Sequence, residues 1–214
     1  MKYKMYDEMM EQPDSLRKTF ESEMSTMDEV SNLISDKDKI YLIGCGSSIS
    51  TCYSVRDAIR MSSTNIDIEV YTGYEFYYNK KLVENENAIA IFTSQSGETA
   101  DTLASLRRAN EFNIHTVSIS NEPESSMIKE AKTPIVTRCE TETAILGTKT
   151  YITQLACLYQ ILFTASDYEA KDELLAHLAQ MPDTLEELLK TTEYSNRLLA
   201  EDFKKPFYML INNI

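Results

Sequence analysis

The chain has 214 residues, of which 43% are apolar and 26% charged, an ordinary balance for one α/β domain with additional helices. Its formal net charge of −13 argues against nucleic acid or an anionic membrane as the main partner. No apolar run approaches the roughly 20 residues that span a bilayer, and no signal peptide is evident, so we expect a cytoplasmic protein. Four cysteines lack the spacing of a metal site, and no metal is expected: Cys45, Cys52, Cys139 and Cys157.

Strand and helix signals alternate between residues 35 and 166. Short β-rich runs are separated by segments of helix length, a pattern that predicts a parallel sheet with helices on both faces. We therefore expect an α/β fold with a doubly wound, five-stranded parallel sheet of the flavodoxin type. The expected strands are Lys39–Gly44, Ile66–Tyr71, Ala88–Phe92, Ile114–Ile119 and Pro134–Thr137.

Helical segments flank this region on both sides. Residues 1–34 carry apolar residues at helical spacing and predict one or two helices that cover the sheet. Residues 167–214 predict two amphipathic helices separated at Met181–Pro182, followed by a strand at Phe207–Ile211. The expected organisation is thus an N-terminal helical segment (1–34), a sheet domain (35–166) and a C-terminal segment (167–214).

A glycine-rich turn, GCGSS at Gly44–Ser48, follows the first strand and leads into a helix expected over Ile49–Met61. Its G-x-G start is also typical of dinucleotide-binding loops, in which a third glycine would occupy the position of Ile49. Glu69 has the spacing of a ribose contact but lies in an alternating strand. The alternative is a hydroxyl-lined turn in which Ser47 and Ser48 face a ligand.

The stretch TSQSGETAD, at Thr93–Asp101, separates a buried strand from a helix expected over Thr102–Asn110. A helix N-terminus favours an anion, hydroxyl groups add neutral donors, and glycine permits close approach. The stretch therefore predicts a phosphate site without lysine or arginine. The alternative is an ordinary helix start with Ser96 as its N-cap.

A third polar loop, CETETAILGTKT at Cys139–Thr150, precedes a long apolar helix expected over Tyr151–Thr164. The carboxyl ends of parallel strands meet at one edge of a sheet, where ligands bind in doubly wound folds. We therefore expect this loop, the GCGSS turn and the TSQSGETAD stretch to open at the same edge.

The three loops and the EQPDSL segment at Glu11–Leu16 resemble the sugar isomerase (SIS) domain. The similarity is to the first of two tandem SIS domains in glucosamine-6-phosphate synthases and to fructosamine-6-phosphate deglycases. It implies a hexose 6-phosphate or amino-sugar 6-phosphate ligand, no cofactor, and an isomerase, aminotransferase-isomerase, deaminase or deglycase. The residues that would bind the substrate are Gly46, Ser47, Ser48, Ser94, Gln95, Ser96, Gly97, Thr99 and Ile145.

In that family the glutamate that moves the proton and the histidine that opens the ring lie in the second SIS domain, of which Phe207–Ile211 would be the first strand. Within this chain Glu142 is the best candidate for a catalytic base, because it lies in a motif loop. Leu146 and Gly147 replace an expected alanine and serine. A homodimer or a second SIS domain is the expected partner, and a non-catalytic sugar-phosphate sensor is the alternative function.

Other titratable residues have structural interpretations. Glu98 is expected to complement the helix dipole, and Glu75 lies farther from the loops. His115 and His177 are expected to be structural or solvated. Lys149 is expected to be solvated at a helix start, because nothing in its surroundings suggests the lowered pKa of a Schiff-base lysine.

Overall fold

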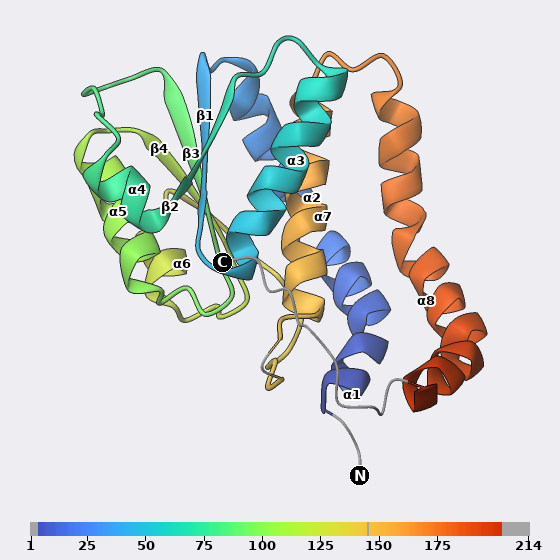
Figure 1. The fold of residues 1–214 in the computed structure, drawn as a ribbon. Coiled ribbons are helices and arrows are strands. Elements are labelled where there is room, and N and C mark those ends of the chain that lie inside the picture. Colours follow the sequence, from blue (N-terminus) through green and yellow to red (C-terminus); the bar gives the residue numbers. More distant parts are fainter. Residues whose placement is uncertain (1–3, 145, 203–214) are drawn as a thin grey trace.

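The structure of the chain, a computed structural model, describes residues 4–144 and 146–202. Within these residues five strands form one parallel sheet in the order β2-β1-β3-β4-β5, which confirms the expected α/β fold (Figure 1). The strands are β1 (Lys39–Gly44), β2 (Ile68–Thr72), β3 (Ala88–Ser94), β4 (His115–Ser120) and β5 (Thr133–Val136). The helices are α1 (Lys4–Met10), α2 (Gln12–Ser35), α3 (Ser47–Ser62), α4 (Gly73–Tyr78), α5 (Ala100–Glu111), α6 (Ser126–Glu130), α7 (Lys149–Ala165) and α8 (Lys171–Asp202).

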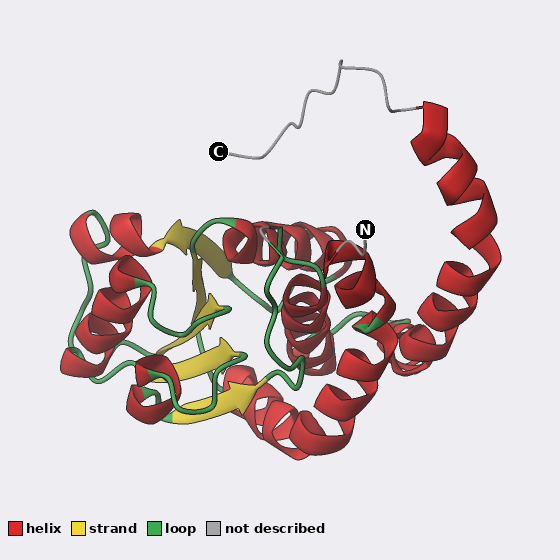
Figure 2. Ribbon diagram, turned by 90° about the horizontal axis from the view of Figure 1, so that it is seen from below, coloured by secondary structure: helices red, strands yellow, loops and turns green. Residues whose placement is uncertain are grey.

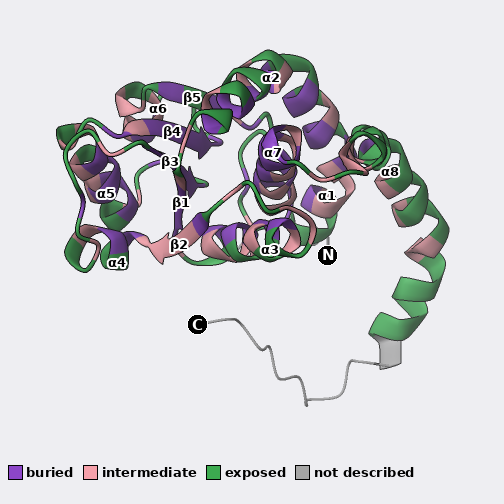
Figure 3. Ribbon diagram, turned by 90° about the horizontal axis from the view of Figure 1, so that it is seen from above, coloured by how far each residue is buried: buried purple, intermediate pink, exposed green. Residues whose placement is uncertain are grey.

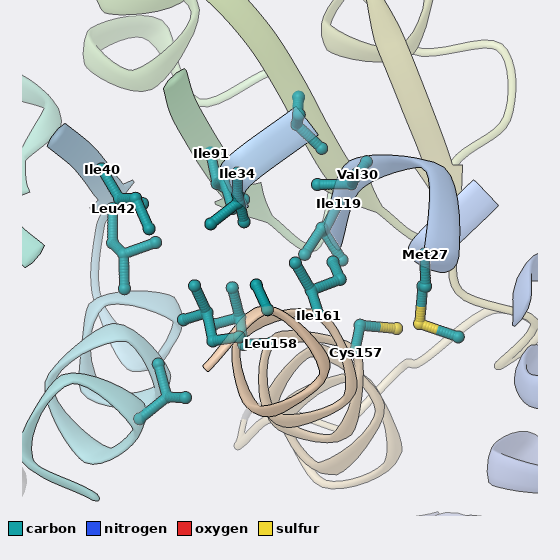
Figure 4. Close-up of a cluster of buried hydrophobic side chains, with 14 of the residues drawn as sticks. Met27, Val30, Ile34, Ile40, Leu42, Ile91, Ile119, Cys157, Leu158 and Ile161 are labelled. Carbon is teal, nitrogen blue, oxygen red and sulfur yellow. The ribbon is translucent and has the colours of Figure 1, made fainter. Parts of the chain in front are cut away.

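Alternate residues of the central strands enter two separate cores. Ile40 and Leu42 of β1 pack in the core that α2, α3 and α7 cover, and Figure 4 shows these side chains facing those of α7. Tyr41 and Ile43 point to the opposite face, where α4, α5 and α6 lie. Every residue of β3 is buried, as expected for a central strand of a parallel sheet covered on both faces.

The order of the strands places the site. From β1 the chain crosses to β2 on one side and then returns to β3 on the other, so the direction in which successive strands are added reverses between β1 and β3. In this register Gly44, the last residue of β1, lies opposite Thr93 of β3. Loops that leave these two strand ends frame the crevice in which doubly wound folds bind their ligands. Figure 2 shows this edge of the sheet from below.

The prediction of two C-terminal helices was wrong, because Pro182 lies inside the single helix α8. Proline removes one N–H donor and bends a helix without having to end it. The proximal half packs against the core through Leu174 and Leu178, while the distal half is largely exposed (Figure 3). No helix in the described part of the chain combines the length and apolar character needed to cross a bilayer. The strand expected at Phe207–Ile211 lies outside the described residues.

Candidate functional site

The first loop of the site joins β1 to α3 and is shaped by two glycines. Gly46 has a φ of 58°, in the left-handed region that glycine adopts readily, and α3 begins directly after it. A Cβ on Gly44 would lie 2.7 Å from Oγ1 of Thr93, so a larger residue would push the two strand ends apart. Ser47 is exposed and Ser48 is buried at the first turn of α3. The turn therefore offers one accessible hydroxyl at the β1–β3 crevice.

The second loop, Ser94–Thr99, folds around its own hydroxyl groups. Oγ of Ser94 lies 3.0 Å from Oγ1 of Thr99 and accepts a hydrogen bond of 3.1 Å from the N–H of Gly97. This turn places Thr99 at the N-cap of the 12-residue helix α5. A helix N-terminus carries partial positive charge, so the hydroxyls converge where an anion is favoured.

Two details of the second loop show how tightly it is constrained. Gly97 has a φ of 63°, and a Cβ there would overlap the side chains of Ser120 and Ser125. Ser96 was a candidate N-cap of the following helix, and this alternative was wrong because the N-cap is Thr99. Oγ of Ser96 instead accepts a hydrogen bond of 3.2 Å from the N–H of Glu98. The N-cap of α5 therefore lies three residues after Ser96, because the chain first completes a tight turn.

The loop after β4 contacts both the second and the third loop, although none of its residues was predicted from the sequence. The N–H of Asn121 and the hydroxyl of Ser120 donate to the carbonyl of Gln95, at 3.1 and 3.2 Å. The side chain of Asn121 accepts from the N–H of Cys139 at 3.0 Å and donates to the carbonyl of Glu140 at 2.9 Å. Asn121 therefore links the second loop to the start of the third. A polar run directly after a buried strand was the available signal.

The third loop is organised around the carboxylate of Glu142, which is 9% exposed. Oε1 accepts hydrogen bonds from the N–H and hydroxyl of Thr148, at 2.6 and 2.8 Å, and from the N–H of Lys149 at 3.0 Å. Oε2 accepts from the hydroxyl of Thr150. These donors belong to the N-cap and first turn of α7, so Glu142 satisfies the N–H groups at the start of that helix.

Contacts between the loops bring the three predicted segments together at one edge of the sheet. The hydroxyl of Thr102, in the first turn of α5, donates to Sγ of Cys45 at 3.4 Å. A Cβ on Gly147 would lie 3.6 Å from Oγ of Ser47, which places the third loop beside the first. Ile145, another predicted contact, lies outside the described residues. The first two loops, GCGSS and SQSGET, contain no lysine or arginine.

The other carboxylates singled out from the sequence are held by structural partners. Oε1 of Glu98 accepts a hydrogen bond of 2.6 Å from the N–H of Ser126 and joins the second loop to α6. Glu75 forms a capping box with Thr72 at the start of α4. Glu69, the candidate ribose contact, instead pairs with Lys39 and Lys80, at 2.7 and 2.9 Å. These contacts favour the hydroxyl-lined interpretation of the first turn over the dinucleotide alternative.

Among the basic residues singled out from the sequence, one differs from expectation. Lys149 was expected to be solvated, but it is 1% exposed. Its Nζ lies 2.5 Å from Oε2 of Glu11, directly before α2, and this ion pair compensates for the burial of the charge. His115 is half-buried, and Nε2 lies 2.9 Å from Oγ1 of Thr133. Burial and the charges of nearby lysines hold the pKa of His115 below its usual range. His177 is exposed on α8.

The described residues offer no cluster of three or more histidine, cysteine or acidic side chains that could hold a metal ion. Burial raises the pKa of the Cys52 thiol to about 11 and that of Cys139 above its usual value. These thiols therefore stay protonated near neutral pH, and they pack as small side chains.

Comparison with known proteins identifies the fold and the family. A family model described as the SIS domain matches residues 33–164. The glutamine–fructose-6-phosphate aminotransferase (isomerizing) of Clostridium acetobutylicum is 31% identical over 221 residues, covering 96% of this chain and 36% of the relative. Among solved structures, the C-terminal domain of glucosamine-fructose-6-phosphate aminotransferase from Francisella tularensis has a TM-score of 0.73 at 24% identity, covering 94% of this chain and 57% of that one.

Glucosamine-6-phosphate deaminase from Thermotoga maritima superimposes with a TM-score of 0.60 at 25% identity, covering 85% of this chain and 54% of that one. The chain spans about a third of the length of the curated relatives it matches. The family match takes in every strand of the sheet and the three loops at its carboxyl edge. The chain belongs to the SIS domain family.

Proposed function

We propose that this chain binds a hexose 6-phosphate or an amino-sugar 6-phosphate. The binding would serve an aldose–ketose isomerase, an aminotransferase-isomerase, or a deaminase or deglycase. The observation that carries the proposal is the convergence of the Ser94 and Thr99 hydroxyls at the N-terminus of α5, beside the first loop. The chain's net charge of −13 repels anions, so local donors and the helix dipole would have to hold the phosphate.

The proposed roles follow the loops. The phosphate ester would lie against the second loop, with Gln95 and Ser96 exposed at its rim and Gly97 allowing close approach of the backbone. Gly46, Ser47 and Ser48 of the first loop would face the sugar hydroxyls. The third loop, with Ile145 among its residues, would line the remainder of the ligand.

A catalytic role of Glu142 remains a prediction, and its contacts favour a structural role. The carboxylate already accepts four hydrogen bonds from the start of α7. A base at C1–C2 needs a free lone pair directed at the substrate. The same observation favours a second candidate function, a sugar-phosphate sensor in which this chain binds the ligand without transforming it.

The wider organisation is proposed on the same basis. The chain would comprise a helical segment (1–34), the SIS domain (35–166) and a C-terminal segment (167–214), in a cytoplasmic protein. A second SIS domain or a second copy of the chain would complete the enzyme. The exposed apolar side chains of distal α8, among them Leu188 and Tyr194, support such a partner surface.

The proposal is tested by thermal unfolding with glucose 6-phosphate, fructose 6-phosphate, glucosamine 6-phosphate, inorganic phosphate and NAD. A ligand that binds only the folded protein raises the unfolding temperature by mass action. We expect a rise with the hexose 6-phosphates and none with NAD. A rise with NAD alone would favour the dinucleotide alternative, and no rise with any sugar phosphate would contradict the proposal. Conversion of a bound sugar phosphate by the same protein would distinguish the enzyme from the sensor.

A further inference from the structure

One buried carboxylate contacts the third loop from the far end of the sequence. Glu8 lies on α1, 135 residues before the loop, and is 5% exposed. Glu8 lies outside every loop at the edge of the sheet, and none of the roles described above includes it. Burying a carboxylate is unfavourable unless hydrogen bonds or charges compensate, so its partners should reveal what it does.

The partners of Glu8 are the backbone of the loop itself. Oε1 accepts hydrogen bonds from the N–H and hydroxyl of Thr143, at 2.5 and 3.1 Å, and from the N–H of Ala144 at 3.0 Å. Oε2 lies 3.1 Å from the same Ala144 nitrogen. Burial alone would raise the pKa of Glu8, but these hydrogen bonds and the charge of Lys149 outweigh it and lower the pKa below its usual value. The carboxylate is therefore ionised near neutral pH.

Neighbouring contacts show that Glu8 has a distinct task. Glu142 binds the N-terminus of α7, and Glu11 pairs with Lys149 at the same helix start. Glu142 thus fixes the loop to α7, and Glu11 fixes the start of α7 to the start of α2. Of the three carboxylates, only Glu8 contacts Thr143 and Ala144. These two residues precede Gly147, at which the third loop approaches Ser47 of the first loop.

We propose that Glu8 is a positioning residue of the ligand site: it fixes the backbone at Thr143 and Ala144 in the position from which they face the sugar part of the ligand. The inference rests on the proposed function. The second loop is fixed by its own hydroxyls and by Asn121, with no contact from α1 among its hydrogen bonds in the described residues. Glu8 therefore affects recognition of the sugar and leaves recognition of the phosphate unchanged.

The experiment compares dissociation constants for glucose 6-phosphate and inorganic phosphate in the wild-type protein and three variants. Glu8→Ala removes every acceptor, whereas Glu8→Gln keeps the shape and one carbonyl oxygen for the Thr143 and Ala144 donors. Glu21→Ala, at an exposed position of α2, is the matched control. Circular dichroism and the unfolding temperature of each variant establish that it folds.

We expect the Kd for glucose 6-phosphate to rise about tenfold in Glu8→Ala, the effect of losing one or two well-formed hydrogen bonds, and about twofold in Glu8→Gln. The Kd for inorganic phosphate should stay within about twofold in both, and Glu21→Ala should match the wild type. An unchanged Kd for glucose 6-phosphate in Glu8→Ala overturns the inference, and so does an equal loss of both ligands. If Glu8→Ala does not fold, the test rests on Glu8→Gln. The inference is then overturned if the ratio of the Kd for glucose 6-phosphate to the Kd for inorganic phosphate is the same in Glu8→Gln as in the wild type. Wild-type protein that binds no sugar phosphate contradicts the proposed function itself.

Discussion

The second and third loops lie at the same edge of the sheet but are held in place by different means. The second loop, Ser94–Thr99, is fixed by hydroxyl and backbone groups within six residues and by the adjacent loop after β4. The third loop, between Cys139 and Thr148, depends on two buried carboxylates, one of them 135 residues away on α1. The candidate site thus combines a locally encoded part with a part that exists only after distant helices have packed.

The difference matches the chemistry that each loop would meet. A phosphate needs donors and no nearby negative charge. The second loop supplies hydroxyls, and its one carboxylate, Glu98, accepts a hydrogen bond from the N–H of Ser126. The two buried carboxylates that hold the third loop, Glu8 and Glu142, face its backbone, where N–H and O–H donors stabilise their charge. Two negatively charged side chains can thus lie near an anion site because each is already paired.

The largest effect is expected from a substitution of Gly97, the glycine of the second loop. Gly97→Ala combines a φ of 63° with overlap of Ser120 and Ser125, so we expect a loss of about 3 kcal/mol or more in the free energy of unfolding and loss of phosphate binding. Gly147→Ala in the third loop is the control, because its Cβ would have no neighbour closer than 3.6 Å. Urea unfolding measures both. Equal stability of the two variants would show that the second loop is less constrained than its geometry indicates.

A smaller effect is expected from the cap of the third loop. Glu142→Ala leaves the donors of Thr148, Lys149 and Thr150 without their acceptor, so we expect a loss of about 2–3 kcal/mol in the free energy of unfolding. Glu140→Ala, in the same loop, removes an exposed carboxylate paired with Lys18 and should leave the free energy of unfolding nearly unchanged. Chemical denaturation compares the pair, and a similar cost for both would contradict the capping role.

The sequence predicted what local patterns determine. The five strands, the sheet class and the helix boundaries around the second loop follow from alternation and from glycine and serine positions, and the structure places them within two residues of prediction. Lys149 was predicted to be solvated because its partner, Glu11, is 138 residues away and no local signal marks a buried lysine. Glu8 was missed for the same reason, because the residue it binds, Thr143, is 135 residues away. Asn121 was marked only by the polar run after β4, and its bond to Glu140 forms when the ends of β4 and β5 come together.

The interruption expected at Met181–Pro182 illustrates the opposite error. Proline is a strong local signal, but its cost in a helix is one hydrogen bond and a bend. The leucines on either side of Pro182 pack on the same core, so α8 continues through it. Tertiary contacts thus override a local preference, just as they supply the parts of the site that no local pattern indicates.

Removing one hydroxyl from the second loop and one from the third loop should show which of the two loops binds the phosphate. Thr99→Val keeps the shape but removes the hydroxyl that faces Ser94, and we expect phosphate-ester binding to weaken by about 1–2 kcal/mol. Thr143→Val removes a hydroxyl that donates to Glu8 while keeping the N–H bond, so inorganic phosphate should bind as in the wild type. Calorimetric titration with inorganic phosphate measures both. Equal weakening by the two variants would mean that the phosphate does not lie against the second loop.

The smallest expected effect is that of pH, because acid should loosen the third loop and leave the second loop intact. The pKa of Glu8 is below its usual value because the hydrogen bonds from Thr143 and Ala144 outweigh the effect of burial. A carboxylate with a lowered folded-state pKa contributes stability that is complete above its ordinary pKa, about 4.5, and is lost as the pH falls through the folded value. In the second loop the Gly97 amide is bonded to the Ser94 hydroxyl, which does not titrate in this range, whereas Glu98 of the same loop accepts its hydrogen bond from the N–H of Ser126.

Amide hydrogen exchange of the two loops at pH 6, 5 and 4 tests this difference. After correction for the intrinsic dependence of exchange on pH, protection of the Thr143 and Ala144 amides should fall below pH 4.5. Protection of the Gly97 amide, bonded to Ser94, should change by less than about twofold. In Glu8→Gln the Thr143 and Ala144 amides should lose this pH dependence, because the amide side chain carries no titrating proton. A fall that persists in Glu8→Gln would assign the acid sensitivity to another carboxylate, with Glu142 the next candidate at the same loop.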